Sequence, residues 1–190
     1  MTTAALFIAA LSITSPAFQP AGQLPPKYTC DGQGVNPALT IAGVPAAAKS
    51  LALIVVDPDV PKSIKPDGRY LHWALWNLQA TTTMMIEEGR GGGLSESGRA
   101  GYVPACPPNG EHRYVFQVFA LDRSLGDATI SSEDGLRQAM DGHVLEQAEL
   151  VSRYASQTSN QLNFVFAGIV LAAVAALVYR FIGARAAGRS

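Results

Sequence analysis

The sequence predicts an all-β-dominated domain, a sandwich of strands followed by one late helix, with a separate transmembrane helix near the C-terminus. Three apolar stretches have the length and composition of strands, at residues 51–56, 70–78 and 112–121. Only one other soluble segment, beginning at Ser131 or Ser132, carries the signals of a helix start. Strands and helices do not alternate along the chain, so a parallel α/β sheet is not expected.

The first two predicted strands differ in their patterns. Residues 51–56 (LALIVV) are a continuous β-favouring apolar run, which is typical of a strand buried on both faces, and the DPDVP segment that follows ends it. Residues 70–78 (YLHWALWNL) alternate instead, because successive side chains of a strand point to opposite faces. We expect one face of this strand to hold His72, Ala74 and Trp76.

The third predicted strand and the helix complete the soluble elements. Alternation within residues 112–121 predicts one strand face that holds His112, Tyr114, Phe116 and Val118. After the serine cap, acidic residues occupy the first turn, where the helix dipole favours them. Apolar residues then recur at helical spacing, which predicts a packing face made by Leu136, Met140, Val144, Ala148 and Val151.

Residues 162–182 are long and apolar enough to cross a bilayer, which takes about 20 residues. Only one charged residue, Arg180, interrupts them, and Arg185 and Arg189 follow. Positive charge beside a span favours the cytoplasmic side, so we expect a single-pass membrane protein with a C-terminal anchor and an extracytoplasmic domain. A tail-anchored topology would place the domain on the cytoplasmic side instead.

These patterns divide the chain into five parts. Residues 1–13 are a short apolar segment, which is either a strand or a weak signal peptide. The other four parts are the folded domain at 14–156, a hinge at 157–161, the transmembrane helix at 162–182 and a basic tail at 183–190.

Several functional classes are disfavoured by the composition and motifs. The formal net charge is −1, and no stripe of basic residues interleaved with aromatics is present, so we expect no nucleic-acid partner. The GRGGG run at 89–93 lacks the GK[ST] of a phosphate-binding loop, and no GxSxG motif is present. We therefore expect neither a cofactor nor a catalytic serine.

Two cysteines, Cys30 and Cys106, lie too far apart in sequence to form a CxxC metal or redox pair. In an extracytoplasmic domain whose fold brings them together, they would form a disulfide. Otherwise they are packed thiols. The sequence leaves both alternatives open.

Three residues suggest a site at the ends or edges of the strands. Asp57 ends a buried strand, His72 lies inside the second strand, and His112 begins the third. A carboxylate near two imidazoles raises their pKa and favours the charged ring, which would create a binding site for a phosphate-like anion. The same residues are formally the ligands of a 2-His-1-carboxylate iron site, but no local spacing fixes that geometry, so we expect no metal.

Four segments together resemble the phosphatidylethanolamine-binding protein family, especially its bacterial Raf-kinase-inhibitor-like (YbhB/YbcL-type) branch. They are YTCDG at 28–32, DPDVP at 57–61, the His72-Trp73 pair and CPPNGEHRYVF at 106–116. The resemblance extends over residues 12–154, and the predicted membrane span lies beyond it. One departure is Pro104-Ala105, where the family's bacterial loop usually has Gly-Pro.

The resemblance implies a β-sandwich with a small anion pocket that takes phosphate-type anions or phospholipid headgroups. Carried over residue by residue, it places at the pocket Asp57, His72, Cys106, Pro108, His112 and Tyr114. It gives Asp59 a turn-stabilising role and His143 a structural role on the helix.

From the residues and the resemblance together, we expect a membrane-anchored binding or modulatory protein without enzymatic activity. One alternative is an enzyme that uses the histidine and aspartate cluster for acid–base chemistry. The other is a protein-interaction module that modulates a kinase or protease through the pocket rim.

Overall fold

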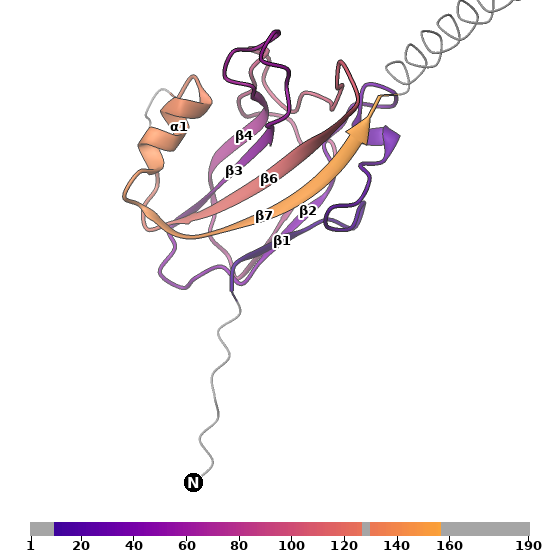
Figure 1. The fold of residues 1–190 in the computed structure, drawn as a ribbon. Coiled ribbons are helices and arrows are strands. Elements are labelled where there is room, and N and C mark those ends of the chain that lie inside the picture. The colour runs from indigo at the N-terminus through magenta and orange to yellow at the C-terminus, as the bar shows by residue number, and fades with distance from the viewer. Residues whose placement is uncertain (1–9, 127–129, 157–190) are drawn as a thin grey trace, which may run out of the picture.

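Two antiparallel sheets pack face to face in the computed structural model, which describes residues 10–126 and 130–156 (Figure 1). The smaller sheet, in the order β1-β2-β5, consists of Ser12–Thr14, Leu39–Ala42 and Thr83–Ile86. The larger sheet, in the order β4-β3-β6-β7, consists of Tyr70–Gln79, Ser50–Asp57, Glu111–Leu121 and Val144–Ala155. A short 3-10 helix, η1 (Pro26–Tyr28), and one α-helix, α1 (Glu133–Met140), complete the described elements. The β-dominated fold with one helix, predicted from the sequence, is confirmed.

The three strands predicted from apolar patterns all form in the larger sheet. Strand β3, which contains the LALIVV run, is buried along its whole length because it pairs with β4 on one side and β6 on the other. On β6 the predicted alternation holds, and His112, Tyr114, Phe116 and Val118 are all buried. The central position of β3 explains why its sequence lacks a polar face.

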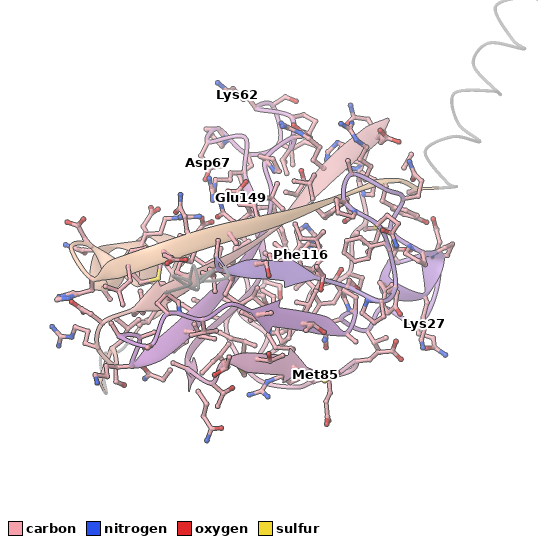
Figure 2. All side chains as sticks on the ribbon, turned by 90° about the horizontal axis from the view of Figure 1, so that it is seen from below. Lys27, Lys62, Asp67, Met85, Phe116 and Glu149 are labelled. Atoms are coloured by element: carbon pink, nitrogen blue, oxygen red, sulfur yellow. A yellow bond between two sulfur atoms is a disulfide. The ribbon has the colours of Figure 1, made fainter. Side chains whose placement is uncertain are left out.

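Each face of the larger sheet buries a separate apolar cluster. The cluster between the two sheets includes Trp73 and Phe116, and Figure 2 shows Phe116 in this layer while Met85 projects from the periphery. The second cluster lies on the opposite face, where α1 packs Leu136 and Met140 against the sheet. The helix therefore covers the outer face of the larger sheet, and the smaller sheet covers its inner face (Figure 1).

The predicted helix is correct at its start and wrong at its end. Ser132 caps α1, since its Oγ accepts a hydrogen bond from the Gly135 N–H at 3.0 Å. The helix stops at Met140, and Gly142 follows in the left-handed region at φ 72°, which reverses the chain. Residues 144–155 then form β7 and pair with β6, so the apolar residues expected on one helix face are divided between two elements.

The predicted membrane localisation is corrected by the structure. Within residues 10–126 and 130–156, no helix is long and apolar enough to cross a membrane. This finding contradicts the single-pass protein expected from the sequence. The predicted hinge, span and basic tail at 157–190 lie outside the described residues, as do residues 1–9. At the end of the N-terminal apolar segment, Leu11 and Ile13 are buried beside or within β1.

Candidate functional site

A cavity of about 320 Å³ opens where β3 and β4 meet the segment 103–108. Its walls are formed by Asp57, Val60, Ile64, Tyr70, His72, Val103, Pro104, Cys106 and Pro108. Most of these side chains are apolar, so a few polar groups orient whatever occupies the cavity. Asp57 and His72 are the lining residues that bring a carboxylate and an imidazole.

Asp57, the last residue of β3, is held by two hydrogen bonds. Its Oδ2 accepts a hydrogen bond from His112 Nδ1 at 2.7 Å, and its Oδ1 accepts one from the Asp59 N–H at 2.8 Å. Asp57 and His112 are each only 3% exposed. Because a buried carboxylate requires partners, the pair forms a fixed polar unit in which Asp57 lines the cavity and His112 lies behind it.

The structure gives the turn-stabilising role expected of Asp59 to Asp57, which also lines the cavity. Asp57, rather than Asp59, stabilises the turn, because it accepts the backbone N–H two residues ahead. Asp59 instead pairs with Arg113 of β6, whose Nε and Nη2 donate to its two oxygens at 2.8 and 2.6 Å. These hydrogen bonds from Arg113 lower the pKa of Asp59 below its usual value.

A β-bulge determines where His72 points. Strand β3 pairs Val55 with Trp73 but Val56 with Leu71, so His72 is the extra residue of β4. His72 and Trp73 consequently both face the layer between the sheets. The sequence-based prediction that His72 shares a face with Ala74 is wrong, because Ala74 belongs to the cluster under α1.

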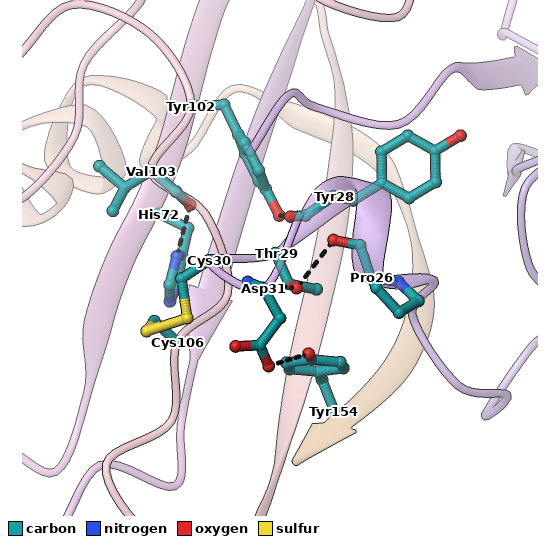
Figure 3. The surroundings of a disulfide bond; sticks show 10 residues. All are labelled: Pro26, Tyr28, Thr29, Cys30, Asp31, His72, Tyr102, Val103, Cys106 and Tyr154. Atoms are coloured by element: carbon teal, nitrogen blue, oxygen red, sulfur yellow. Dashed lines mark hydrogen bonds between the residues drawn. A yellow bond between two sulfur atoms is a disulfide. The ribbon is translucent and has the colours of Figure 1, made fainter. Parts of the chain in front are cut away.

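The hydrogen bonds of His72 fix the tautomer of its ring. Nδ1 lies 2.8 Å from the carbonyl oxygen of Val103, and a carbonyl can only accept, so Nδ1 carries the hydrogen (Figure 3). The Val103 N–H in turn donates to the His72 carbonyl at 2.9 Å. Burial lowers the pKa of His72 below its ordinary value, so the ring is neutral at pH 7 and Nε2 is an acceptor.

Tyr114 lies behind His72 and does not line the cavity. Its ring meets the His72 ring edge-on, with centroids 5.2 Å apart, and the residue is 1% exposed. Its hydroxyl has no hydrogen-bond partner among the residues that the structure describes. Burial, followed by the charge of Asp57, raises the pKa of this phenol well above its ordinary value.

We expect Tyr114→Phe to leave ligand affinity unchanged and to raise the free energy of unfolding by up to about 1 kcal/mol, because it removes a buried hydroxyl without a partner. Urea unfolding and calorimetric titration of the same preparation measure both quantities. A tenfold loss of affinity would instead show that the hydroxyl contacts the ligand.

A disulfide between Cys30 and Cys106 closes the rim of the cavity (Figure 3). The two Cα atoms are 5.4 Å apart, although 76 positions separate the residues in sequence. Of the two alternatives left open by the sequence, the structure therefore contains the disulfide rather than packed thiols. Cys106 is thus both a wall of the cavity and one end of a covalent cross-link.

The structure brings together the six residues that the sequence singled out, but in two layers. Asp57, His72, Cys106 and Pro108 line the cavity. His112 and Tyr114 lie behind them and contact Asp57 and His72 respectively. Sequence reasoning missed the remaining lining residues, which are Val60, Ile64, Tyr70, Val103 and Pro104. Val60 lies within the DPDVP motif, and the other four adjoin the quoted motifs or His72 in sequence or space. Most of the five are apolar and carry no chemical signal of their own.

Two other sequence features have structural roles in the described chain. His143 lies in the turn before β7 rather than on the helix, and its Nδ1 contacts Asp122 Oδ1 at 3.0 Å. In the GRGGG run, the Gly92 carbonyl accepts a hydrogen bond from Trp73 Nε1 at 2.8 Å, which fastens this loop to β4. Across residues 10–126 and 130–156, no group of three histidine, cysteine, aspartate or glutamate side chains is arranged to hold a metal ion.

Comparison with known proteins identifies relatives across nearly the whole described chain. The family model for phosphatidylethanolamine-binding protein matches residues 14–155. A UPF0098 protein of Chlamydia pneumoniae is 46% identical over 147 residues, which cover 76% of this chain and 98% of that protein. A UPF0098 protein of Methanothermobacter thermautotrophicus is 38% identical over 153 residues, with the same coverage of 76% and 98%.

Two solved structures have the same fold. A putative phosphatidylethanolamine-binding protein homologue from Chlamydia trachomatis matches with a TM-score of 0.74 and 41% identity, over 78% of this chain and 99% of that one. YbcL of E. coli, described as a new member of the mammalian PEBP family, matches with a TM-score of 0.68 and 27% identity, over 78% of this chain and 100% of that one.

Proposed function

The chain belongs to the phosphatidylethanolamine-binding protein family, and from this premise we propose that it is a binding protein for a small phosphate-bearing ligand, either a free anion or a phospholipid headgroup. The ligand would occupy the cavity beside Asp57 and His72. The observation that carries this proposal is the fixed tautomer of His72, which leaves Nε2 as its remaining hydrogen-bonding atom.

A phosphate monoester suits this ring because its second pKa is about 6. The phosphodiester of a phospholipid headgroup has no such proton, so it would accept a hydrogen bond from the protonated ring. At pH 7 a neutral Nε2 can accept the hydrogen of a P–OH group, or the ring can take up a proton and donate to a dianionic oxygen. Either arrangement places one shared proton between His72 and the ligand. Charge-assisted hydrogen bonds of this kind are stronger than neutral ones, particularly in a buried site.

The carboxylate of Asp57 opposes anion binding, but its environment moderates the repulsion. Both oxygens already accept hydrogen bonds, from His112 and from the Asp59 backbone. Arg113 also interacts electrostatically with Asp57, although Asp59 pairs with the same guanidinium. The electrostatics therefore favour a ligand that shares its proton with His72 over one that must bring two full negative charges.

The proposal predicts that affinity falls as pH rises. Burial lowers the pKa of His72, so above pH 7 the free ring is neutral and the free phosphate is mostly dianionic. Because the complex contains one shared proton, binding takes up a proton, and affinity decreases by up to about tenfold per pH unit under these conditions. Calorimetric titration with inorganic phosphate and with O-phosphoethanolamine between pH 5.5 and 8 measures this slope. Equal affinities across the range would contradict the shared proton.

Variants of two histidines make the test specific. In His72→Asn, the amide N–H can replace the Nδ1–H donor toward Val103, whereas Nε2 has no counterpart. We expect affinity to fall about 10- to 150-fold, the equivalent of one charge-assisted hydrogen bond. His143→Ala is the matched control, because it removes an imidazole that lies outside the cavity. Loss of affinity in both variants would argue against a specific role for His72.

The hydrogen-bonded Asp57–His112 pair beside His72 also favours a second candidate, an enzyme that uses these groups for acid–base chemistry. The two functions predict different results with phosphoester substrates. Turnover by the unmodified chain that disappears in His72→Asn would support the enzyme. Saturable binding without turnover would support the binding protein.

A further inference from the structure

The segment 106–110 approaches the cavity with few restraints. Within the described part of the chain, residues 106–110 form no hydrogen bond with any other segment. Pro107 and Pro108 have no N–H to donate. This segment nevertheless supplies Cys106 and Pro108 to the cavity wall. Packing of the buried Pro107 and the disulfide are what attach it to the domain before β6 begins.

The other end of the disulfide belongs to a firmly held segment. The Cys30 N–H donates to the Ala105 carbonyl at 3.0 Å, and the hydroxyl of Tyr154 donates to Asp31 (Figure 3). The Thr29 hydroxyl donates to the Pro26 carbonyl at 2.9 Å. These contacts do not depend on the sulfur bond, so residues 28–31 remain a fixed base whether or not the disulfide is present.

Both cysteines are exposed, so a reductant can reach the bond. Exposed disulfides are the ones commonly used in regulation or catalysis, whereas buried ones resist reduction. The disulfide that a reductant can reach is therefore also a bond that holds residues 106–110 at the cavity wall.

We propose that this disulfide is a redox switch for the cavity: the oxidised chain binds the phosphate-bearing ligand, and reduction by a dithiol releases residues 106–110 and weakens binding. The inference rests on the proposed function. The thiolate of the dithiol attacks one sulfur of the disulfide, releases the other cysteine and forms a mixed disulfide with the chain. The second thiol of the reductant then attacks the mixed disulfide and releases the remaining cysteine. The chain gains two electrons and two protons as two thiols, and the reductant becomes a cyclic disulfide.

The test compares the oxidised full chain with the same chain reduced by dithiothreitol, using O-phosphoethanolamine as the probe. If residues 106–110 occupy the position needed for binding for about one tenth of the time after reduction, the apparent Kd for O-phosphoethanolamine rises about tenfold. Reoxidation should restore the original affinity. The double variant Cys30→Ser/Cys106→Ser should bind like the reduced chain in the absence of reductant. Because this variant can fail to fold, reduction and reoxidation of the unmodified chain are the primary comparison, with circular dichroism as a check.

Backbone NMR order parameters give a readout that does not depend on the ligand. Reduction should lower the order parameters of the Asn109 and Gly110 amides, while those of the base at 28–31 change little. Equal affinities in the two redox states, with binding intact, would overturn the switch alone. Absence of binding by the oxidised chain would overturn the proposed function. Unchanged order parameters at 109–110 would show that the disulfide does not restrain the rim, and would also overturn the switch.

Discussion

Asp57→Ala is expected to lower the free energy of unfolding by about 2–5 kcal/mol, because each buried donor that loses its acceptor costs roughly 1–3 kcal/mol. The variant leaves His112 buried without the acceptor of its Nδ1–H, and it leaves the Asp59 N–H without an acceptor as well. Ligand affinity should fall together with stability, because Asp57 lines the cavity and positions the turn at its edge.

Urea unfolding of the oxidised chain measures this loss, and Asp59→Ala is the matched control two residues away. Asp59 forms an ion pair with Arg113, but its side chain is 28% exposed and that of Arg113 is 48% exposed. Such pairs contribute about 1 kcal/mol or less. Similar destabilisation in the two variants would show that burial of the Asp57–His112 pair has no special importance.

Asp57→Asn separates the shape of the side chain from its charge. The amide keeps one oxygen for either the Asp59 N–H or His112 Nδ1, but its NH₂ group faces the remaining donor. We therefore expect destabilisation close to that of the alanine variant. Full stability in Asp57→Asn would mean that His112 can adopt its other tautomer without cost.

Gly93→Ala is expected to destabilise the domain by about 2–4 kcal/mol, from overpacking together with a strained backbone. A Cβ at this position would lie 2.4 Å from the Ala74 carbonyl oxygen and 2.9 Å from Trp73 Nε1. Gly93 also has φ +88°, which L side chains rarely adopt. The adjoining residue, Leu94, exchanges two backbone hydrogen bonds with Ala74, so the chain cannot easily move away.

Gly91→Ala supplies the control within the same GRGGG run. A Cβ there would meet no atom within 4 Å, so its effect should stay below about 0.5 kcal/mol, as is usual for surface substitutions. Thermal or urea unfolding of the two variants gives the comparison. Equal stability of Gly93→Ala and Gly91→Ala would show that residues 92–94 can move away from β4 at little cost in free energy.

The sequence predicts the strands of the larger sheet well where burial dominates their composition. Residues 51–56 of β3 are all apolar because sheet neighbours and clusters surround them. The sequence predicts β7 as a continuation of the helix for two physical reasons. Its buried face includes a serine, Ser152, and two of its apolar residues, Val144 and Leu145, are exposed, so the alternation is obscured.

The candidate site is predictable in its polar residues and unpredictable in its geometry. Asp57 and His72 could be identified by their chemistry and by the family motifs. The bulge that turns His72 toward Val103 depends on the register between β3 and β4, and no local pattern encodes that register. The apolar walls, such as Val60 and Ile64, are equally compatible with an ordinary loop until the fold brings them to Asp57.

The hydrogen bond between Asp57 and His112 joins residues 55 positions apart and has a consequence for the order of folding. Strands β3 and β4 are neighbours along the chain, as are β6 and β7, whereas the pairing of β3 with β6 closes a long loop. The first pair supplies Asp57 and His72, and the approach to β6 supplies Cys106 and Pro108, so a chain with only the two local pairs has no cavity. A bound ligand should therefore slow unfolding and leave the folding rate unchanged, because it recognises only the completed sheet.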